Sequence, residues 1–489
     1  MRFANASGWR IPRGMRQFAS TQDTIAAIAT PLGRGGVGIV RVSGPACRDI
    51  ATRLFESARE AFAGCKPYRL HHGWVRDSEG QRLDEVLIAL MPGPGSYTGE
   101  DVLELNCHGG PAVLRAVLGA VLDAGVRPAE PGEFTYRAFM NGRLDLTQAE
   151  AVAEMIAAPT RAALTLAQAK LAGGLRESVA TLRVRLEELR MKLCVAVDFP
   201  DDEVECLSPQ EFQDAVSGVA EEIRTLVRNF DRGRMWRDGA LCVLAGRVNA
   251  GKSSLMNALL GRERAIVTDI PGTTRDWIEE ALDLDGLPVR LVDTAGLRET
   301  GDAVERVGLE RGREITERAD VVLLVVDRTQ PLAPEDVALA QDLGPERAVA
   351  VFNKSDLAGA GGAANAVELC ETMGETGRWF AGAGFTIVEI SARTGAGLDA
   401  LCAEVRARAV GAEAEPDAGQ LVPNLRQARG LAAAQLELDA LSGDIESGLP
   451  YDVLGVRLEM ACTHLSEITG DIAPDDVLKS VFGSFCIGK

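Results

Sequence analysis

The 489-residue sequence predicts a multidomain protein that combines α/β and all-α parts. Strand and turn patterns dominate residues 23–141, and helical periodicity characterises two further regions, which we bound at residues 142–236 and 411–489. Between these helical regions, residues 237–410 contain short apolar strands that end in glycine-rich or acidic motifs. Because the termini of a domain usually lie close together, we expect this second α/β domain to be inserted into one helical domain formed by 142–236 and 411–489.

The first 22 residues carry Arg2, Arg10, Arg13 and Arg16 and no acidic residue. Such a start is typical of an organellar transit peptide, but also of a disordered tail or of a start codon assigned too far upstream. We favour the last two explanations.

The ten cysteines form no C-x-x-C pair and only four histidines occur, which indicates neither a disulfide framework nor a zinc site. A cytoplasmic location is therefore expected, or an organellar matrix if the start is a transit peptide.

Charge and hydropathy exclude some classes of protein. A formal net charge of −19 argues against indiscriminate nucleic-acid binding, although a local basic patch or a partner could still serve a specific RNA. No stretch of about 18 uncharged apolar residues occurs, so we expect no membrane span.

The elements can be placed from periodicity and turn residues. Within the first domain we expect strands at 24–30, 38–43, 83–90 and 101–105, a loop at 92–96 and a helix at 111–124. The first helical region, 144–228, is broken at 173–174 and 199–202. After an acidic linker at 413–419, helical pattern runs from residue 422 to the end, with breaks at 447–450 and 470–474.

The inserted domain opens with an apolar strand, 240–245, followed by Gly246-Arg247-Val248-Asn249-Ala250-Gly251-Lys252-Ser253-Ser254 and a helix. This run fits G-x-x-x-x-G-K-[ST], in which backbone N–H groups and a helix N-terminus face a phosphate chain. Lys252 would reach the β- and γ-phosphates, and Ser253 would hold Mg²⁺. The alternative is a chance glycine-rich turn.

Three further motifs follow apolar strands in the order that a Ras-like P-loop GTPase domain requires. The run Asp293-Thr294-Ala295-Gly296 supplies a carboxylate for the Mg²⁺ sphere. In Asn353-Lys354-Ser355-Asp356, the Asp356 carboxylate can accept hydrogen bonds from the guanine N1–H and amine, which adenine does not offer. Ser391-Ala392-Arg393 provides a backbone contact for the base. Together the four motifs predict a GTP-binding domain.

The switch region lacks the glutamine that orients water in many small GTPases, because Leu297 occupies that position. Asn249 could instead offer an oxygen to a monovalent cation, with the run Thr268-Asp269-Ile270-Pro271-Gly272-Thr273-Thr274-Arg275-Asp276 completing a cage. A K⁺ there would sit where other GTPases receive an arginine finger. Thr274 is a candidate second Mg²⁺ ligand. An ordinary turn residue is the alternative for Asn249.

The whole arrangement resembles the MnmE (TrmE) family of tRNA-modification GTPases. The features that carry the resemblance are the run from Ala29 to Ile39, G-x-x-N-x-G-K-S-S, T-D-x-x-G-T-T-R-D, and the terminal Phe485-Cys486-Ile487-Gly488-Lys489. The match extends from about Asp23 to Lys489.

The resemblance implies that GTP hydrolysis is coupled to modification of the wobble uridine (U34) of tRNA at C5, which adds a carboxymethylaminomethyl or aminomethyl group. The family works with a FAD- and NADH-dependent partner, MnmG (GidA), in a hetero-oligomer. A 5,10-methylene- or 5-formyl-tetrahydrofolate bound to the folate-binding-like α/β domain, which also forms the homodimer, supplies one carbon. By this resemblance Arg41, Glu104, Arg143 and Lys489 are folate-binding.

The resemblance also implies roles in hydrolysis. Asn249, Thr268, Ile270 and Thr273 match the K⁺ ligands, and Glu305 matches the glutamate that positions the catalytic water. Cys486 matches a cysteine that tRNA modification needs. The GTP-binding positions are Asn249, Ala250, Gly251, Lys252, Ser253, Ser254, Thr268, Asp269, Ile270, Pro271, Gly272, Thr273, Thr274, Asp293, Thr294, Ala295, Gly296, Asn353, Lys354, Asp356, Ser391, Ala392 and Arg393.

Three residues depart from the family pattern: Val248 replaces a usual proline, Pro271 a small residue, and Arg143 a lysine. The alternative function, which the G domain alone would also fit, is a regulatory or ribosome-assembly GTPase switch without chemistry of its own. The first domain and the terminal cysteine segment favour the enzyme, because a pure switch would need neither.

Overall fold

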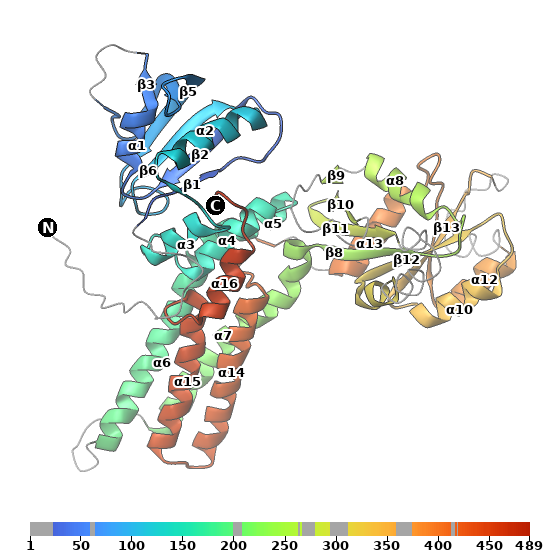
Figure 1. Cartoon of the computed structure of the whole chain (residues 1–489). Coiled ribbons are helices and arrows are strands. Elements are labelled where there is room, and N and C mark those ends of the chain that lie inside the picture. The colour runs from blue at the N-terminus through green and yellow to red at the C-terminus, as the bar shows by residue number, and fades with distance from the viewer. Residues whose placement is uncertain are drawn as a thin grey trace, which may run out of the picture. The chain divides into compact units, whose positions relative to one another are not determined.

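The computed structural model describes residues 23–58, 64–198, 208–262, 265–266, 279–293, 312–357, 374–411, 416–417 and 419–489 (Figure 1). Their contacts divide the chain into two compact units. The first comprises Met1–Ala153, Arg176–Val219 and Ala433–Lys489, and the second comprises Glu154–Leu175 and Ala220–Ala432. The domain ranges expected from the sequence stay a prediction. Within the described residues, every helix is too short or too polar to span a bilayer.

The described part of the first unit contains a seven-stranded sheet with the order β3-β4-β5-β6-β2-β1-β7. Its strands are β1 (Ile25–Ile28), β2 (Val37–Ser43), β3 (Phe55–Ser57), β4 (Leu70–Arg76), β5 (Arg82–Met91), β6 (Val102–His108) and β7 (Arg127–Pro128). Neighbouring strands are antiparallel except for β1 and β7, which are parallel.

Helices α1 (Cys47–Leu54) and α2 (Pro111–Asp123) contribute to the hydrophobic core on one face of this sheet. Successive side chains of a strand point to opposite faces, so the buried residues of β2 and β6 alternate with partly exposed ones. The cross-strand pair Val40 and Leu105 belongs to the core, whereas the next pair, Arg41 and Glu104, lies on the other face. The strand register therefore places two charged groups side by side.

The rest of the first unit is helical. Its helices, four of which continue into the second unit, are α3 (Glu133–Met140), α4 (Leu146–Ala157), α6 (Gly174–Asp198), α7 (Pro209–Asp238), α14 (Leu425–Glu446), α15 (Tyr451–Thr469) and α16 (Asp475–Gly483). Tyr136 of α3 packs edge-on against Phe482 of α16, with ring centroids 5.4 Å apart. A Cβ at Gly132 would lie 2.3 Å from the Phe482 carbonyl oxygen. This close approach fixes the helix that leads into the C-terminal tail.

In its described residues the second unit holds helix α5 (Arg161–Leu171) and another seven-stranded sheet, with the order β14-β13-β12-β8-β11-β10-β9. The strands are β8 (Ala240–Ala245), β9 (Ala265–Ile266), β10 (Glu279–Leu284), β11 (Leu287–Asp293), β12 (Val321–Asp327), β13 (Ala348–Asn353) and β14 (Thr386–Glu389). The run from β14 to β11 is parallel, and β10 and β9 are antiparallel.

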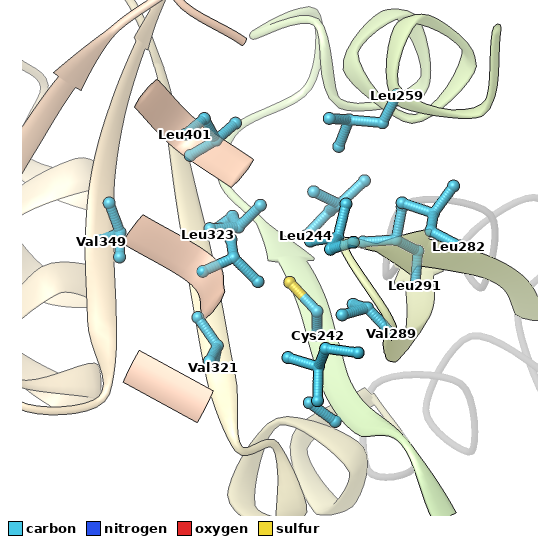
Figure 2. Packing of buried hydrophobic residues seen from close by; sticks show 14 of the residues in the cluster. Cys242, Leu244, Leu259, Leu282, Val289, Leu291, Val321, Leu323, Val349 and Leu401 are labelled. Atoms are coloured by element: carbon cyan, nitrogen blue, oxygen red, sulfur yellow. The ribbon is translucent and has the colours of Figure 1, made fainter. Parts of the chain in front are cut away.

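Both faces of this second sheet are covered, which explains why its central strands are apolar throughout. Alternate residues of β8 enter two different cores: Cys242 and Leu244 one, Val243 and Ala245 the other. The first core includes residues of α8 (Lys252–Arg262) and α13 (Leu398–Val410), and the second includes residues of α10 (Pro334–Leu343) and α12 (Gly374–Gly382). Figure 2 shows part of the first core, with Leu259 of α8 and Leu401 of α13 near the leucines of the sheet.

The predicted fold class is confirmed, and so are the strands and helices expected at 83–90, 101–105, 111–124 and 240–245. The sequence interpretation missed α1, β3 and β4. The pattern of β4, Leu70-His71-His72-Gly73-Trp74-Val75-Arg76, contains two histidines and a glycine and lacks a clean apolar alternation. Gly73 is required there, because a Cβ would lie 2.1 Å from the carbonyl oxygen of Glu56 in β3.

Candidate functional site

The predicted nucleotide site lies at the carboxyl ends of four parallel strands. Strand β8 leads into the P-loop, while β11, β12 and β13 end at Asp293, Asp327 and Asn353. In the sheet, β8 lies between β11 and β12, so the strand order reverses on either side of it. In open α/β sheets the crevice outside such a reversal is where ligands bind. The topology therefore brings to one edge motifs that are 40 residues (Ser253 and Asp293) to 103 residues (Ala250 and Asn353) apart in sequence.

Side chains hold four carbonyl groups of the P-loop. Lys252 Nζ donates to the carbonyls of Gly246 and Arg247, at 2.9 and 2.7 Å. Lys354 Nζ donates to the Asn249 carbonyl at 2.9 Å, and Asn353 Nδ2 to the Ala250 carbonyl at 3.1 Å. In a trans peptide the following N–H points away from its carbonyl. Each bond therefore turns the following amide away from its own donor, and together the four bonds fix the path of the loop backbone.

Two positions of the loop require glycine because of their backbone conformation and their close contacts. Gly246 and Gly251 have φ values of +133° and +99°, which residues with a Cβ rarely adopt. A Cβ on Gly251 would lie 2.2 Å from Asn353 Nδ2, and one on Gly246 would lie 2.3 Å from the Val325 carbonyl oxygen. The first glycine thus lets the loop pass over β12, and the second admits the asparagine that contacts it.

The residues expected to hold Mg²⁺ are already adjacent. Ser253 Oγ, in the first turn of α8, donates to Asp293 Oδ2 at the end of β11, at 2.9 Å. A hydroxyl and a carboxylate are the hard oxygen ligands that Mg²⁺ prefers. The Asp293 side chain is nearly buried, so its charge is poorly screened and favours a bound cation. This donor pair fits the ion.

On the base side, Asn353 joins three segments. Its Oδ1 accepts from the backbone N–H of Lys354 at 2.8 Å and of Ala392 at 3.0 Å, in addition to the P-loop contact above. Asp356 Oδ1 accepts from Ser391 Oγ at 2.8 Å. The Arg393 guanidinium is 3.9 Å from Asp356 and mostly exposed. Ser391 thus fixes the orientation of the Asp356 carboxylate from one side. A carboxylate that accepts hydrogen bonds from the edge of a base needs such an orientation.

Sequence reasoning did not single out Asp327. Its Oδ2 accepts from Lys354 Nζ at 2.7 Å, and its Oδ1 accepts from the N–H and hydroxyl of Thr329 at 2.9 and 2.7 Å. Burial acts to raise the pKa of this carboxyl, but the bonds from Lys354 and Thr329 outweigh burial and lower the pKa below its ordinary value. An acidic residue at the end of the apolar run 321–326 was the available signal.

Part of the predicted site lies outside the described residues. This part comprises Thr268, Asp269, Ile270, Pro271, Gly272, Thr273, Thr274, Thr294, Ala295, Gly296 and Glu305. Of the expected K⁺ ligands, the structure therefore describes Asn249 alone. Asn249 is exposed and has a φ of +65°.

The C-terminal tail forms a second candidate site within the first unit. Arg41 of β2 pairs with Glu104 of β6, with both Nε and Nη2 at 2.9 Å from Oε1. Its Nη1 donates to the Gly488 carbonyl at 3.1 Å. The guanidinium carbon also lies 5.8 Å from the ring centroids of both Tyr97 and Phe134. Charged groups and aromatic rings thus converge where the chain ends.

The other predicted residues of this region are nearby or exposed. Burial lowers the pKa of Lys489, and the charge of Arg41 lowers it further, against an opposing effect of Glu104. Cys486 is exposed, and its carbonyl accepts from the Lys489 N–H at 3.3 Å. Arg143 lies next to the 96–100 loop, since a Cβ on Gly99 would lie 3.2 Å from the Arg143 Cγ.

A buried ionic cluster supports the helix that carries Phe134. Arg137 of α3 is fully buried and contacts Asp23 at 2.5 Å, Glu133 at 3.0 Å and Glu100 at 3.1 Å. Arg127 pairs with Glu133 at 2.6 Å. Buried charges are tolerated only when they are paired and hydrogen-bonded. The cluster therefore ties α3 to β7 and to Asp23, which lies two residues before β1.

Comparisons with known proteins identify the family of the chain. Family models for the GTP-binding protein TrmE N-terminus and the MnmE helical domain match residues 24–143 and 146–486. The chain belongs to the MnmE family. The tRNA modification GTPase MnmE of Nitratidesulfovibrio vulgaris strain DP4 is 53% identical over 469 residues, covering 96% of this chain and 99% of the relative.

More distant MnmE relatives match over nearly the same length. The protein of Symbiobacterium thermophilum is 45% identical over 470 residues, and that of Lawsonia intracellularis 44% over 469 residues. Each match covers 96% of this chain and 100% of the relative. Among solved structures, Era of Aquifex aeolicus with bound GDP and AlF4⁻ is 26% identical over 40% of this chain and 66% of that chain, with a TM-score of 0.28. The family resemblance seen in the sequence is confirmed by the full-length relatives.

Proposed function

We propose that this protein is a GTPase that drives modification of the wobble uridine (U34) of tRNA at C5. The observation that carries the proposal is the edge of the second sheet, where the P-loop, Asp293, Asn353 and Asp356 meet. Full-length relatives named tRNA modification GTPases support the biological role. The docked C-terminal tail supports an enzyme over a regulatory switch, because a switch has no need of a terminal cysteine segment held beside Arg41.

In this proposal the loop amides and Lys252 bind the phosphate chain, and Asp356 recognises guanine. Ser253 and Asp293 would hold Mg²⁺, joined by Thr274; the ion neutralises phosphate charge during phosphoryl transfer. Glu305 would position the attacking water, taking the part that a glutamine plays in many small GTPases. Residues of this chain would thus bind both the base and the phosphates.

Asn249 would contribute an oxygen to a K⁺ ion, together with Thr268, Ile270 and Thr273. The exposed side of the loop, where Asn249 lies, leaves it accessible to a second G domain. A monovalent cation beside the phosphates supplies positive charge where many GTPases use an arginine. Pairing of two G domains across the nucleotide would then couple hydrolysis to the state of the partner subunit.

Arg41, Glu104, Arg143 and Lys489 would bind a 5,10-methylene- or 5-formyl-tetrahydrofolate. The charged pair Arg41–Glu104, flanked by two aromatic rings, suits a flat heteroaromatic ring with polar edges. Cys486 would act in the tRNA modification itself. The proposed assembly is a homodimer through the first domain, joined by a FAD- and NADH-dependent partner of the MnmG type, with tRNA as the substrate.

The test is mass spectrometry of wobble nucleosides in tRNA from a strain that lacks the gene. Wild-type protein should restore the C5-modified uridine, and Cys486→Ser should not. Cys194→Ser is the matched control, because Cys194 is also exposed but lies on α6. Unmodified U34 with the wild-type gene would refute the assignment of the substrate. Equal GTP turnover in K⁺ and Na⁺ would refute only the proposed role of K⁺.

A further inference from the structure

Two residues of the nucleotide site share a rare backbone conformation. In the described chain, the non-glycine residues with positive φ are Tyr68, Asn249, Asp285 and Lys354. Asn249, with φ +65°, and Lys354, with φ +68°, contact each other through Lys354 Nζ and the Asn249 carbonyl. Strained residues persist only where surrounding contacts over-determine them, and they cluster at functional sites. The contact therefore helps to hold the P-loop asparagine in the left-handed conformation, which asparagine adopts more readily than most residues with a side chain.

The Lys354 ammonium needs a second anchor to do this. Lysine has a flexible four-carbon side chain with many rotamers, so one carbonyl bond does not fix it. Asp327 supplies the anchor, with 2.7 Å between Oδ2 and Nζ. The Asp327 side chain is 15% exposed and is itself held by two bonds from Thr329, so the pair is rigid and poorly screened.

The strand register explains why Asp327 can reach Lys354. Strands β12 and β13 are parallel neighbours, and Asp327 pairs in register with Asn353, the residue before Lys354. Asn353 meanwhile holds the next P-loop carbonyl, that of Ala250. Two consecutive residues, Asn353 and Lys354, thus donate to two consecutive loop carbonyls, those of Ala250 and Asn249. Asp327 fixes the direction of the Lys354 side chain.

We propose that Asp327 is a positioning residue, which presents Asn249 to the monovalent cation by fixing Lys354. The inference rests on the proposed function, in which Asn249 is a K⁺ ligand. Asp327 itself contacts neither the base nor the phosphates in this assignment. Its loss should therefore weaken the response to K⁺ and leave the recognition of guanine by Asp356 intact.

The experiment compares Asp327→Asn, Asp327→Glu and wild type in the full-length protein. GTP turnover is measured over a range of K⁺ concentrations at constant ionic strength, and GDP affinity is measured in Na⁺ buffer. For Asp327→Asn we expect the half-activating K⁺ concentration to rise about tenfold, the size expected for one charge-assisted hydrogen bond. Turnover at saturating K⁺ should recover to near the wild-type value. Asp327→Glu, which keeps the charge, should fall between the two.

Two further variants decide between positioning and a general loss of structure. Asp285→Asn is the matched control, because Asp285 lies in the same unit but is 90% exposed. It should leave the K⁺ response unchanged. Thr329→Val keeps both charges and removes one bond to Asp327, so it should shift the K⁺ response in the same direction by a smaller factor. Thr329→Val also provides the test if Asp327→Asn does not fold.

Several outcomes would overturn the inference. A K⁺ response unchanged in Asp327→Asn or, if that variant is unfolded, in Thr329→Val would show that Lys354 needs no anchor. A loss of GDP affinity as large as the loss of K⁺ response would assign Asp327 to the base site instead. If wild-type turnover is already equal in K⁺ and Na⁺, the cation part of the proposed function fails, and this inference fails with it. If the wild type depends on K⁺ and the K⁺ response of the variant is unchanged, the inference about Asp327 fails and the proposed function stands.

Discussion

The substitution Gly488→Ala should release the C-terminal tail while leaving the G domain intact. Gly488 has a φ of +97°, and a Cβ there would lie 2.4 Å from the Ile28 carbonyl oxygen and 2.8 Å from the Ala29 Cα. Both neighbours are backbone atoms, one at the end of β1 and one directly after it, so they cannot rotate away as a side chain would. The tail must therefore move, and it then loses the bond from Arg41 to the Gly488 carbonyl.

The size of the effect follows from two contributions. A residue with a Cβ in the left-handed region costs about 1–2 kcal/mol. A lost hydrogen bond from a charged donor costs about 1.5 kcal/mol more. The total of about 3 kcal/mol raises the ratio of undocked to docked tail by roughly 100-fold, since each 1.4 kcal/mol is a factor of ten.

The assay is the release of Lys489 by a carboxypeptidase that removes basic C-terminal residues. When docking is fast relative to cleavage, the rate of release tracks the undocked population. We expect Gly488→Ala to lose Lys489 up to about 100-fold faster than wild type, with GTP turnover unchanged. Gly483→Ala is the control, because no atom lies within 4 Å of an added Cβ there. Equal rates for Gly488→Ala and wild type would refute the reasoning.

Three other changes test the remaining parts of the structure. Gly251→Ala should lower GTP affinity at least about tenfold, because the new Cβ would lie 2.2 Å from Asn353 Nδ2 and would displace that side chain. Nucleotide titration measures the affinity. Gly261→Ala is the control, because a Cβ there meets no atom within 4 Å. Arg137→Met should destabilise the protein by about 3 kcal/mol, because the largely buried Glu100 loses its ion pair, while Asp23 and Glu133 remain paired with Arg127; urea unfolding checks it, and a loss below about 1 kcal/mol would contradict it. The pKa of Asp23 is lowered because bonds from Arg127 and Arg137 outweigh burial, which acts to raise it. Its stabilising contribution is therefore present above the ordinary value of 3.8 and is lost as the pH falls through the lower folded value; an acid titration of unfolding should show this loss in wild type and not in Asp23→Asn.

Much of the nucleotide site could be predicted from the sequence because its residues follow strands directly. A glycine-rich loop after an apolar strand has few other uses, and parallel strands bring their carboxyl ends to one edge. That argument identifies Ser253 and Asp356 from the sequence alone. It does not reach Asp327, because an aspartate after a strand is equally typical of a turn. Only the register of β12 with β13 shows that it meets Lys354.

The tail site was accessible from the sequence only through the family resemblance. Arg41 and Gly488 are 447 residues apart, and neither has a periodicity that links it to the other. The ionic cluster of Arg137 was missed for a related reason. Arginine is mostly exposed in proteins unless it is paired, and the full burial of Arg137 depends on three carboxylates from three separate segments.

Both candidate sites depend on a glycine that admits an atom from a distant segment. At Gly251 the atom is Asn353 Nδ2, and at Gly488 it is the Ile28 carbonyl oxygen, each within 2.5 Å of where a Cβ would stand. One added methyl group should therefore disable either site separately. If hydrolysis drives modification, Gly251→Ala should abolish both GTP turnover and wobble-uridine modification, whereas Gly488→Ala should abolish modification alone. Normal modification by a Gly251→Ala protein that no longer hydrolyses GTP would show that the two activities are not coupled in this direction.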